Sequence, residues 1–297
     1  MISEIKQLLK FHIGNQHLLA SHDLNHVFNQ TMFDLKEILK TYELCDKEVL
    51  DLGCGQRYPF SLLCSLNNAN VTALDIDYIK PGNIFLIFFR ILYYNGIKRV
   101  IKTIFRKIFL DTKYYTILTK QSQKTINTYK RKINFILYDP NSGEYPLDSS
   151  TFDLITSNAV LEHVNDVDQF AKELYRLLKN DGVFYGIIHN YYSISGGHNL
   201  EWAFPDTKPS STIPPWDHLL DNKFPTFVYL NKLKPEEYKQ IFSKYFDILF
   251  FNGCGLNHIE GEFEGLSYYK NSLDERLKKY SKELLTTRAY KIIIKKK

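Results

Sequence analysis

Short apolar runs alternate with helically spaced segments along most of the chain. Seven runs are rich in β-branched and aromatic residues, which pack well on a pleated surface, and each is short enough to be a strand. Before them, residues 1–44 carry apolar residues at helical spacing, such as Ile5, Leu8 and Leu35, and are predicted to form N-terminal helices. The predicted strands span residues 48–52, 70–76, 133–138, 152–157, 182–189, 246–251 and 289–294.

The clearest helix is predicted between the fourth and fifth strands. Asp166 can cap its first turn, Phe170 and Leu174 belong to an apolar stripe, and the "NDG" of 180–182 should end it. Alternating strands and helices favour a mostly parallel sheet with helices on both faces. The chain has 297 residues, of which 44% are hydrophobic, and this suffices for one α/β domain over 1–297.

Two segments interrupt the alternation. Residues 78–132 are too long for an ordinary connection, and the spacing of Ile97, Val100, Ile101 and Ile104 predicts a helical insertion after the second strand. Residues 190–233 are rich in Gly, Pro, Ser and aromatic residues, which indicates a long functional loop or lid that contacts the substrate.

Positive charge gathers in the insertion. Residues 78–132 hold 13 Lys/Arg against one acid, so their net charge is +12, whereas the whole chain carries only +5. Three interpretations stay open: a helical subdomain with a solvated basic face, a helix that docks on an anionic membrane, or a nucleic-acid platform. The last is the least favoured, because the sequence contains no recognisable RNA-binding module. The basic residues on the predicted polar face are Lys98, Arg99, Lys102, Arg106 and Lys107.

The first predicted strand runs into a turn that contains Gly53 and Gly55. Glycine lets the backbone approach a ligand closely, and the helix that follows offers unpaired N–H groups. A dinucleotide site would have a third glycine where this chain has Tyr58, so a pyrophosphate ligand is disfavoured.

Three successive strands end near a carboxylate. Asp51 could hold an amino group, Asp75 could accept from ribose hydroxyls, and Asp139 could accept from an adenine amine. A nucleoside that carries a cationic group satisfies all three, and S-adenosylmethionine is such a molecule.

The motifs "VLDLGCG" (49–55), "VTALDID" (71–77), "LYDP" (137–140), "FDLITSNAVLEHV" (152–164) and "ELYRLLKNDGVFYGIIHN" (173–190) resemble, in order and spacing, the class I S-adenosylmethionine-dependent methyltransferases. The resemblance implies a Rossmann-like, seven-stranded sheet whose last strand is antiparallel. It also implies a set of cofactor contacts at the methionine, ribose, adenine and sulfonium portions: Asp51, Gly53, Cys54, Gly55, Asp75, Ile76, Tyr138, Asp139, Ser157 and Asn158.

Methyl transfer needs a positioned acceptor and, for a weak nucleophile, a general base. His163, in the motif after the fourth strand, is the first candidate, and His198 and His218 in the 190–233 loop are the others. Some members of the family bind a divalent metal with E-x-x-E-H at this place. Here Ala159 stands in the position of the first Glu, before Glu162 and His163, so no metal is expected.

The leading hypothesis is therefore S-adenosylmethionine-dependent O-methylation of a small molecule or a glycan, including a lipid-linked glycan, because the 190–233 loop resembles that of bacterial methyltransferases of glycan synthesis. An RNA methyltransferase that uses the basic insertion, and a non-catalytic cofactor-binding protein, are the alternatives. The N-terminus has no signal-peptide pattern, and the four cysteines form no C-x-x-C pair. We expect free thiols and a cytoplasmic protein, with peripheral membrane contact if the basic helix binds lipid.

Overall fold

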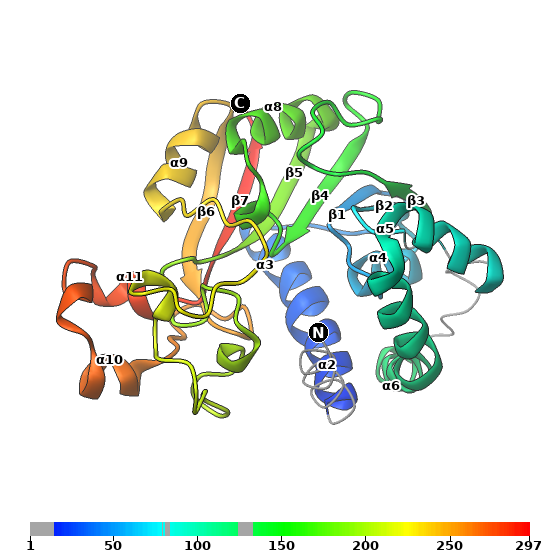
Figure 1. The fold of residues 1–297 in the computed structure, drawn as a ribbon. Coiled ribbons are helices and arrows are strands. Elements are labelled where there is room, and N and C mark those ends of the chain that lie inside the picture. Colours follow the sequence, from blue (N-terminus) through cyan, green and yellow to red (C-terminus); the bar gives the residue numbers. More distant parts are fainter. Residues whose placement is uncertain (1–14, 79, 81–83, 124–132) are drawn as a thin grey trace. The chain divides into compact units, whose positions relative to one another are not determined.

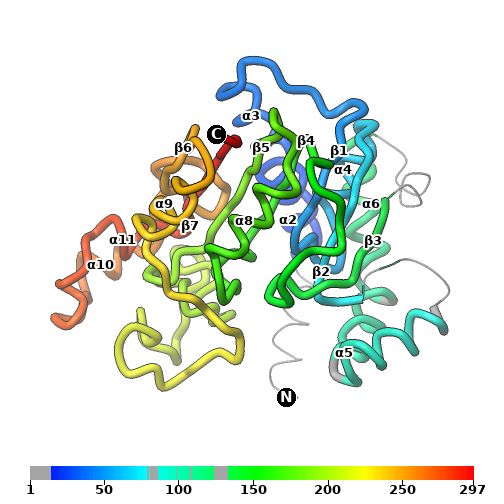
Figure 2. Tube along the Cα trace, turned by 90° about the horizontal axis from the view of Figure 1, so that it is seen from above, coloured from blue at the N-terminus to red at the C-terminus, as the bar shows by residue number. Residues whose placement is uncertain are grey.

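Seven strands form one sheet in the order β3-β2-β1-β4-β5-β7-β6 in the computed structural model, which describes residues 15–78, 80, 84–123 and 133–297 (Figure 1). β1 and β3 pair in parallel with β2, whereas β7 is antiparallel to both β5 and β6 (Figure 2). The predicted mostly parallel sheet with an antiparallel last strand is confirmed, as are all seven strands. Their bounds are β1 Glu48–Leu52, β2 Asn70–Asp75, β3 Asn134–Leu137, β4 Phe152–Asn158, β5 Leu178–His189, β6 Phe246–Cys254 and β7 Ala289–Lys296.

The chain divides into two compact units. The first comprises residues 1–142 with 152–154, as far as they are described, and the second comprises 143–151 with 155–297. The division falls within β4, so each unit holds part of the sheet.

Helices of the first unit precede and follow its strands. The predicted N-terminal helices are confirmed from Gln16 onward, whereas Ile5 and Leu8 lie outside the described residues. The predicted insertion after β2 is helical over Ile84–Ser122, and Gly96 interrupts its long helix with a φ of 75° and a ψ of 171°. The helices are α2 Gln16–His22, η1 Asp23–Asn29, α3 Gln30–Leu39, α4 Pro59–Leu66, α5 Ile84–Arg106, η2 Lys107–Asp111 and α6 Thr112–Ser122.

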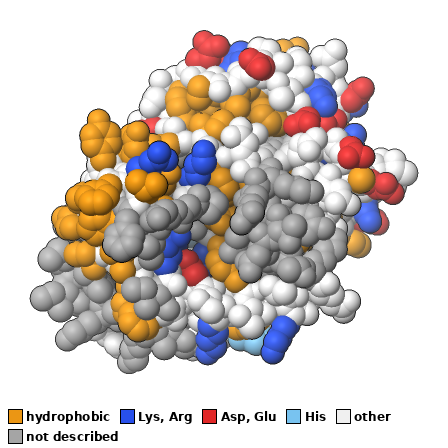
Figure 3. All heavy atoms as spheres, turned by 90° about the vertical axis from the view of Figure 1, so that its right-hand side faces the viewer, with side chains coloured by type: hydrophobic (Ala, Val, Ile, Leu, Met, Phe, Trp, Pro, Cys, Tyr) orange, Lys and Arg blue, Asp and Glu red, His pale blue; other side chains and the backbone are white. Residues whose placement is uncertain are grey.

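The insertion differs from a simple amphipathic helix. Ile87, Ile91 and Val100 are buried in one cluster, as the helical spacing requires, but Ile97 and Ile101 are more than half exposed. Apolar side chains thus lie on more than one face of α5. One face packs against its own unit, and the apolar side chains elsewhere on the helix stay exposed. Figure 3 looks onto the side that carries α5 and α6 in Figure 1, where hydrophobic side chains lie next to Lys and Arg.

α8 shows how local sequence sets a helix boundary in the second unit. The Asp166 side chain accepts a hydrogen bond from the Gln169 N–H at 2.9 Å, so the predicted N-cap is confirmed. The predicted end is wrong, because Leu178 already has extended backbone and begins β5, and the "NDG" lies inside the strand. The helices are η4 Leu161–His163, α8 Val167–Leu177, η5 Leu200–Trp202, η6 Asp217–Leu219, α9 Pro235–Ser243, α10 Leu266–Ser272, η7 Glu275–Leu277 and α11 Lys282–Thr286.

The 190–233 loop has a hydrophobic core of its own. Ile194, Trp202, Ile213 and Trp216 are buried together, and Leu285 from the C-terminal segment joins them. The Trp202 indole N–H donates to the Ile213 carbonyl at 3.2 Å, so the ring is anchored at its polar atom as well. The loop is therefore a packed structure, and its role as a lid stays a prediction.

Two further expectations concern membranes and thiols. Among the residues that the structure describes, no helix has the length and hydropathy needed to cross a bilayer. All four cysteines are free thiols, and Cys45 is exposed whereas the other three are buried, which confirms that they are unpaired.

Candidate active site

The turn after β1 depends on its two glycines. Gly53 and Gly55 have φ values of 71° and 70°, in the left-handed region that favours glycine. The N–H groups of Gly53 and Cys54 both donate to the Leu74 carbonyl of β2, at 2.8 and 3.1 Å. The turn is thus held against the end of the neighbouring strand, with its backbone free of a Cβ at both bends.

Asp75 lies at the end of β2 beside this turn and is 7% exposed. Its two carboxylate oxygens accept from the backbone N–H groups of Gly55 and Asp77, each at 2.8 Å. Burial raises the pKa of Asp75, while the Gly55 N–H and the Arg99 charge act in the opposite direction. The next residue, Ile76, is a large apolar residue that is 55% exposed.

Asp51 is also buried, and it ties strand β1 to helix α4. One of its oxygens accepts from the Ser61 N–H at 3.1 Å and from the Ser61 hydroxyl at 2.5 Å. The predicted contact between Asp51 and an amino group of the cofactor stays a prediction, since this carboxylate already has a structural function.

Tyr58 occupies the place of the third glycine of a dinucleotide site. It has a φ of 39°, is 5% exposed, and packs edge-on against Phe135 of β3 with ring centroids 4.8 Å apart. A bulky ring thus fills the space between α4 and the sheet that a third glycine would leave for close helix packing.

The helical insertion contacts the glycine turn and the end of β2. Arg99 of α5 forms an ion pair with Asp77, and the Asn95 side chain accepts from the Tyr78 N–H at 2.9 Å. Arg57, within the turn, pairs with Asp111 at 3.2 Å. Part of the predicted basic face is therefore used in ion pairs inside this unit, while the side chains of Lys98 and Ile108 lie outside the described residues.

Tyr138 and Asp139 follow β3. The Tyr138 N–H donates to the Asp75 carbonyl at 3.0 Å, and the Asp139 carboxylate accepts from the Asn141 N–H at 2.9 Å. The second bond closes a local turn of the kind that Asp often makes. An adenine contact by either side chain stays a prediction.

In the second unit, β4 ends at Ser157 and Asn158. Ser157 is 1% exposed and its hydroxyl has no hydrogen-bond partner among the described residues, whereas Asn158 is exposed. Ala159 follows with a φ of 55°, and its N–H donates to the Ile187 carbonyl of β5 at 2.8 Å. The chain thus turns sharply at the carboxyl end of the strand, where the resemblance places cofactor contacts.

Asn231 clamps the short helix η4 that comes next. Its side-chain amide donates to the Leu161 carbonyl at 2.7 Å and to the Val164 carbonyl at 3.1 Å, and its backbone N–H donates to the Glu162 carbonyl at 2.8 Å. These bonds fix the backbone that presents Glu162 and His163.

Three histidines and one carboxylate gather at the ends of β4 and β5. The rings of His163 and His198 are 4.9 Å apart, and those of His189 and His198 are 4.6 Å apart. Glu162, which is 2% exposed, lies 3.9 Å from His163 Nε2 and 3.8 Å from His198 Nε2. The structure thus brings two of the three predicted base candidates together.

His218, the third candidate, has its ring engaged elsewhere. Its Nε2–H donates to the Tyr191 carbonyl at 2.8 Å, and burial lowers its pKa to about 4. This bond orients the partly buried ring and links it to the backbone of the same loop, so the ring is suited to hold the loop. Its assignment as a base remains an untested prediction.

His189, Glu264 and Arg288 were not among the residues predicted from the sequence. His189 ends β5, so its position at a strand end is a signal like that of the carboxylates at the other strand ends. Glu264 accepts from the Ser195 hydroxyl at 2.5 Å and pairs with Arg288 at 2.7 Å. No local pattern connects residues so far apart in sequence, so only the fold reveals them.

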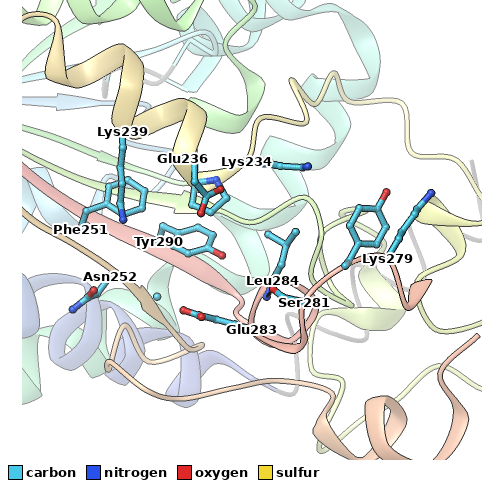
Figure 4. A pocket seen from close by; sticks show the side chains of 13 residues that line it. Lys234, Glu236, Lys239, Phe251, Asn252, Lys279, Ser281, Glu283, Leu284 and Tyr290 are labelled. Carbon is cyan, nitrogen blue, oxygen red and sulfur yellow. Dashed lines mark hydrogen bonds between the residues drawn. The ribbon is translucent and has the colours of Figure 1, made fainter. Parts of the chain in front are cut away.

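A separate cavity of about 330 Å³ lies among α9, β6 and the segment before β7 (Figure 4). Tyr290 and Phe251 provide aromatic walls, and Lys239 and Glu236 of α9 lie beside them (Figure 4). Its lining includes none of the predicted site residues, so it does not add to the cluster described above.

The family follows from comparison with known proteins. A family model for a methyltransferase domain matches residues 24–223, which is more than half of the chain. The chain therefore belongs to this family: it is a class I methyltransferase, and its cofactor is S-adenosylmethionine. No curated protein matches the sequence.

Similar solved structures share little sequence with the chain. PH0226 from Pyrococcus horikoshii is 16% identical with a TM-score of 0.45, and covers 91% of each chain. An S-adenosylmethionine-dependent methyltransferase from Mesorhizobium loti is 13% identical with a TM-score of 0.47, over 86% of this chain and 94% of that one. Phosphoethanolamine N-methyltransferase 2 from Haemonchus contortus, solved with S-adenosylmethionine, is 13% identical with a TM-score of 0.45, over 92% of this chain and 54% of that one.

Proposed function

We propose that the protein transfers the methyl group of S-adenosylmethionine to a hydroxyl oxygen of a small molecule or a glycan. The observation that carries the cofactor part is the buried Asp75, whose carboxylate joins the glycine turn to the end of β2 through the Gly55 and Asp77 N–H groups. A carboxylate held in this way is rigid, and its remaining lone pairs are available to ribose hydroxyls. Gly53 and Gly55 leave space for the ligand beside it.

On the acceptor side, we propose His163 as the general base. Its Nδ1–H donates to the Tyr229 carbonyl at 2.8 Å, so the neutral ring carries its lone pair on Nε2. The side chain is 33% exposed, which leaves that nitrogen accessible to an acceptor. A hydroxyl is a poor nucleophile, and removal of its proton during attack on the sulfonium methyl would make the oxygen reactive.

An acceptor screen tests the substrate class. The protein, incubated with S-adenosylmethionine that carries a labelled methyl group, should label hydroxylated small molecules or glycans, including lipid-linked ones. Amines and total RNA serve as the comparison. Label that enters only RNA would contradict the proposal and support a nucleic-acid function for the basic insertion.

Peripheral contact with an anionic membrane is a second part of the proposal. Phe89 is 64% exposed and Tyr93 is 83% exposed on α5, and Lys102 on the same helix is also exposed. A helical segment that exposes both aromatic side chains and cations is typical of helices that lie in a membrane interface. Such contact would give access to a lipid-linked acceptor.

Vesicle flotation tests this contact. The protein should float with vesicles that contain anionic lipid and should be released as salt screens the charges. The variant Phe89→Ser/Tyr93→Ser should lose this binding, while its affinity for S-adenosylmethionine should not change. Equal flotation of both proteins, or none at low salt, would leave α5 as an ordinary solvated helix.

A further inference from the structure

The histidine cluster contains a buried carboxylate that the proposed base chemistry does not use. Glu162 is 2% exposed, and neither of its carboxylate oxygens has a hydrogen-bond partner among the described residues. A buried carboxylate of this kind is costly unless a positive charge or several donors compensate it. Two imidazole nitrogens, Nε2 of His198 and Nε2 of His163, lie 3.8 and 3.9 Å from one of its oxygens.

The tautomer of His189 can be read from its surroundings. Arg288 pairs with the Glu264 carboxylate at 2.7 Å, and the same carboxylate accepts a hydrogen bond from the Ser195 hydroxyl at 2.5 Å. The Ser195 oxygen can therefore only accept from His189 Nε2, which lies 3.0 Å away. His189 is thus protonated on Nε2, and its Nδ1 presents a lone pair.

That lone pair points at His198. His189 Nδ1 and His198 Nε2 are 2.7 Å apart, and His198 Nε2 is 3.8 Å from a Glu162 oxygen. One ligand atom from each of the three residues lies within 4.8 Å of the others. Three donors around a tetrahedral zinc ion, at bond lengths of about 2.0–2.2 Å, would be about 3.3–3.5 Å apart. Movements of less than about 1 Å would bring the observed set to that geometry.

The loop that carries His198 is built to reach this position. An added Cβ on Gly196 would lie 2.1 Å from the Tyr191 carbonyl oxygen, so only glycine allows the chain to fold back there. His198 then has a φ of 56°, and its N–H donates to the Ser195 carbonyl at 3.0 Å. The same tight turn thus delivers both His198 and the Ser195 hydroxyl to His189.

We propose that Glu162, His189 and His198 bind one divalent transition-metal ion of the zinc class. Two imidazoles and one carboxylate suit such ions, whereas Mg²⁺ and Ca²⁺ prefer oxygen ligands. The Glu264–Ser195 pair orients His189 from behind, as carboxylates commonly orient metal-binding histidines. The ion's charge would compensate Glu162, and a coordination position would remain open for a water or an acceptor oxygen, whose pKa the metal would lower.

The burial of these groups is consistent with such a site. Glu162 is 2% exposed and the side chain of His198 is 20% exposed, so an ion bound between them would be largely shielded from solvent.

This site differs from the E-x-x-E-H metal site of some family members. No metal was expected at that motif, because residues 159–163 have Ala159 in place of its first Glu ligand. The proposed set keeps only Glu162 from that motif and takes its imidazoles from the end of β5 and from the loop. The expectation of no metal therefore does not extend to this set.

Metal titration of the intact protein tests the site without cofactor or acceptor, so the result is independent of the proposed methyl transfer. After chelation and gel filtration, the wild type should take up one Zn²⁺ per chain, and Co²⁺ should give the visible absorption of a four-coordinate site. Glu162→Gln, which preserves the side-chain shape, should weaken binding by more than tenfold. Ser195→Ala should weaken it by about 10- to 100-fold, as loss of an orienting group does.

A matched pair of variants controls for folding. His198 and His258 both have φ values in the left-handed region, 56° and 58°, and Asn tolerates this conformation. His198→Asn should lose the metal, and His258→Asn should bind it as the wild type does. The proposal is overturned if the wild type takes up neither Zn²⁺ nor Co²⁺, or if Glu162→Gln and His198→Asn bind them as tightly as the wild type.

Discussion

Replacement of Asp75 by alanine should weaken the binding of S-adenosylmethionine by about 10- to 150-fold, which corresponds to about 1.5–3 kcal/mol for hydrogen bonds to a charged acceptor. The carboxylate would no longer accept from the ribose hydroxyls. The Gly55 and Asp77 N–H groups, which donate to this carboxylate at 2.8 Å in the wild type, would lose their acceptor, so the turn would lose its shape. Calorimetric titration with S-adenosylmethionine measures the change.

Asp153→Ala is a matched control for this variant. Asp153 lies in the same unit, where its carboxylate accepts from the Glu48 N–H at 2.9 Å at the opposite end of β1. This variant should lose stability to a similar extent but bind the cofactor as the wild type does. Equal cofactor affinity in the Asp75→Ala protein would rule out the ribose contact.

The proposed contact of Asp75 with the ribose should also depend on pH, with a defined sign. The ionised carboxylate is the acceptor, and burial raises the pKa of Asp75. Cofactor affinity should therefore fall on acidification, beginning at a higher pH than an exposed Asp would require. Asp75→Asn, which does not titrate, should lack this dependence.

Glu264→Ala should lower the free energy of unfolding by about 3–5 kcal/mol, the usual cost of removing one partner of a buried ion pair. Arg288, whose side chain is 16% exposed, would lose its carboxylate partner, and the Ser195 hydroxyl would lose its acceptor. Urea unfolding followed in the second unit measures the effect.

Two further variants test whether the burial of the Arg288–Glu264 pair causes the predicted loss of stability. Glu264→Gln keeps an acceptor for Ser195 but removes the charge, so its cost should be intermediate. Asp221→Ala removes a partner of Arg276 at 2.8 Å in a pair that is about half exposed, and it should change stability little. If Glu264→Ala were as mild as Asp221→Ala, the Arg288–Glu264 pair would not hold this part of the second unit together.

The sequence by itself determined the strands, one helix start and the glycine turn. These features are local, because residues close in sequence decide them. They are the β-branched runs of the strands, the Asp that caps its own helix, and the glycines at positive φ. All seven strands lie where the pattern predicted them, and Asp166 caps α8. The end of that helix was misplaced, because extended backbone at Leu178 overrode the terminator signal two residues later.

Only the tertiary structure decided what the polar side chains contact. Asp51 accepts from Ser61, and Asp77 and Asp111 neutralise part of the basic insertion, for which the sequence had left three interpretations open. The gathering of Glu162, His189 and His198, with Glu264 behind them through Ser195, joins residues up to about a hundred positions apart. Such contacts follow from the order of strands and the path of loops between them, and no local periodicity encodes either.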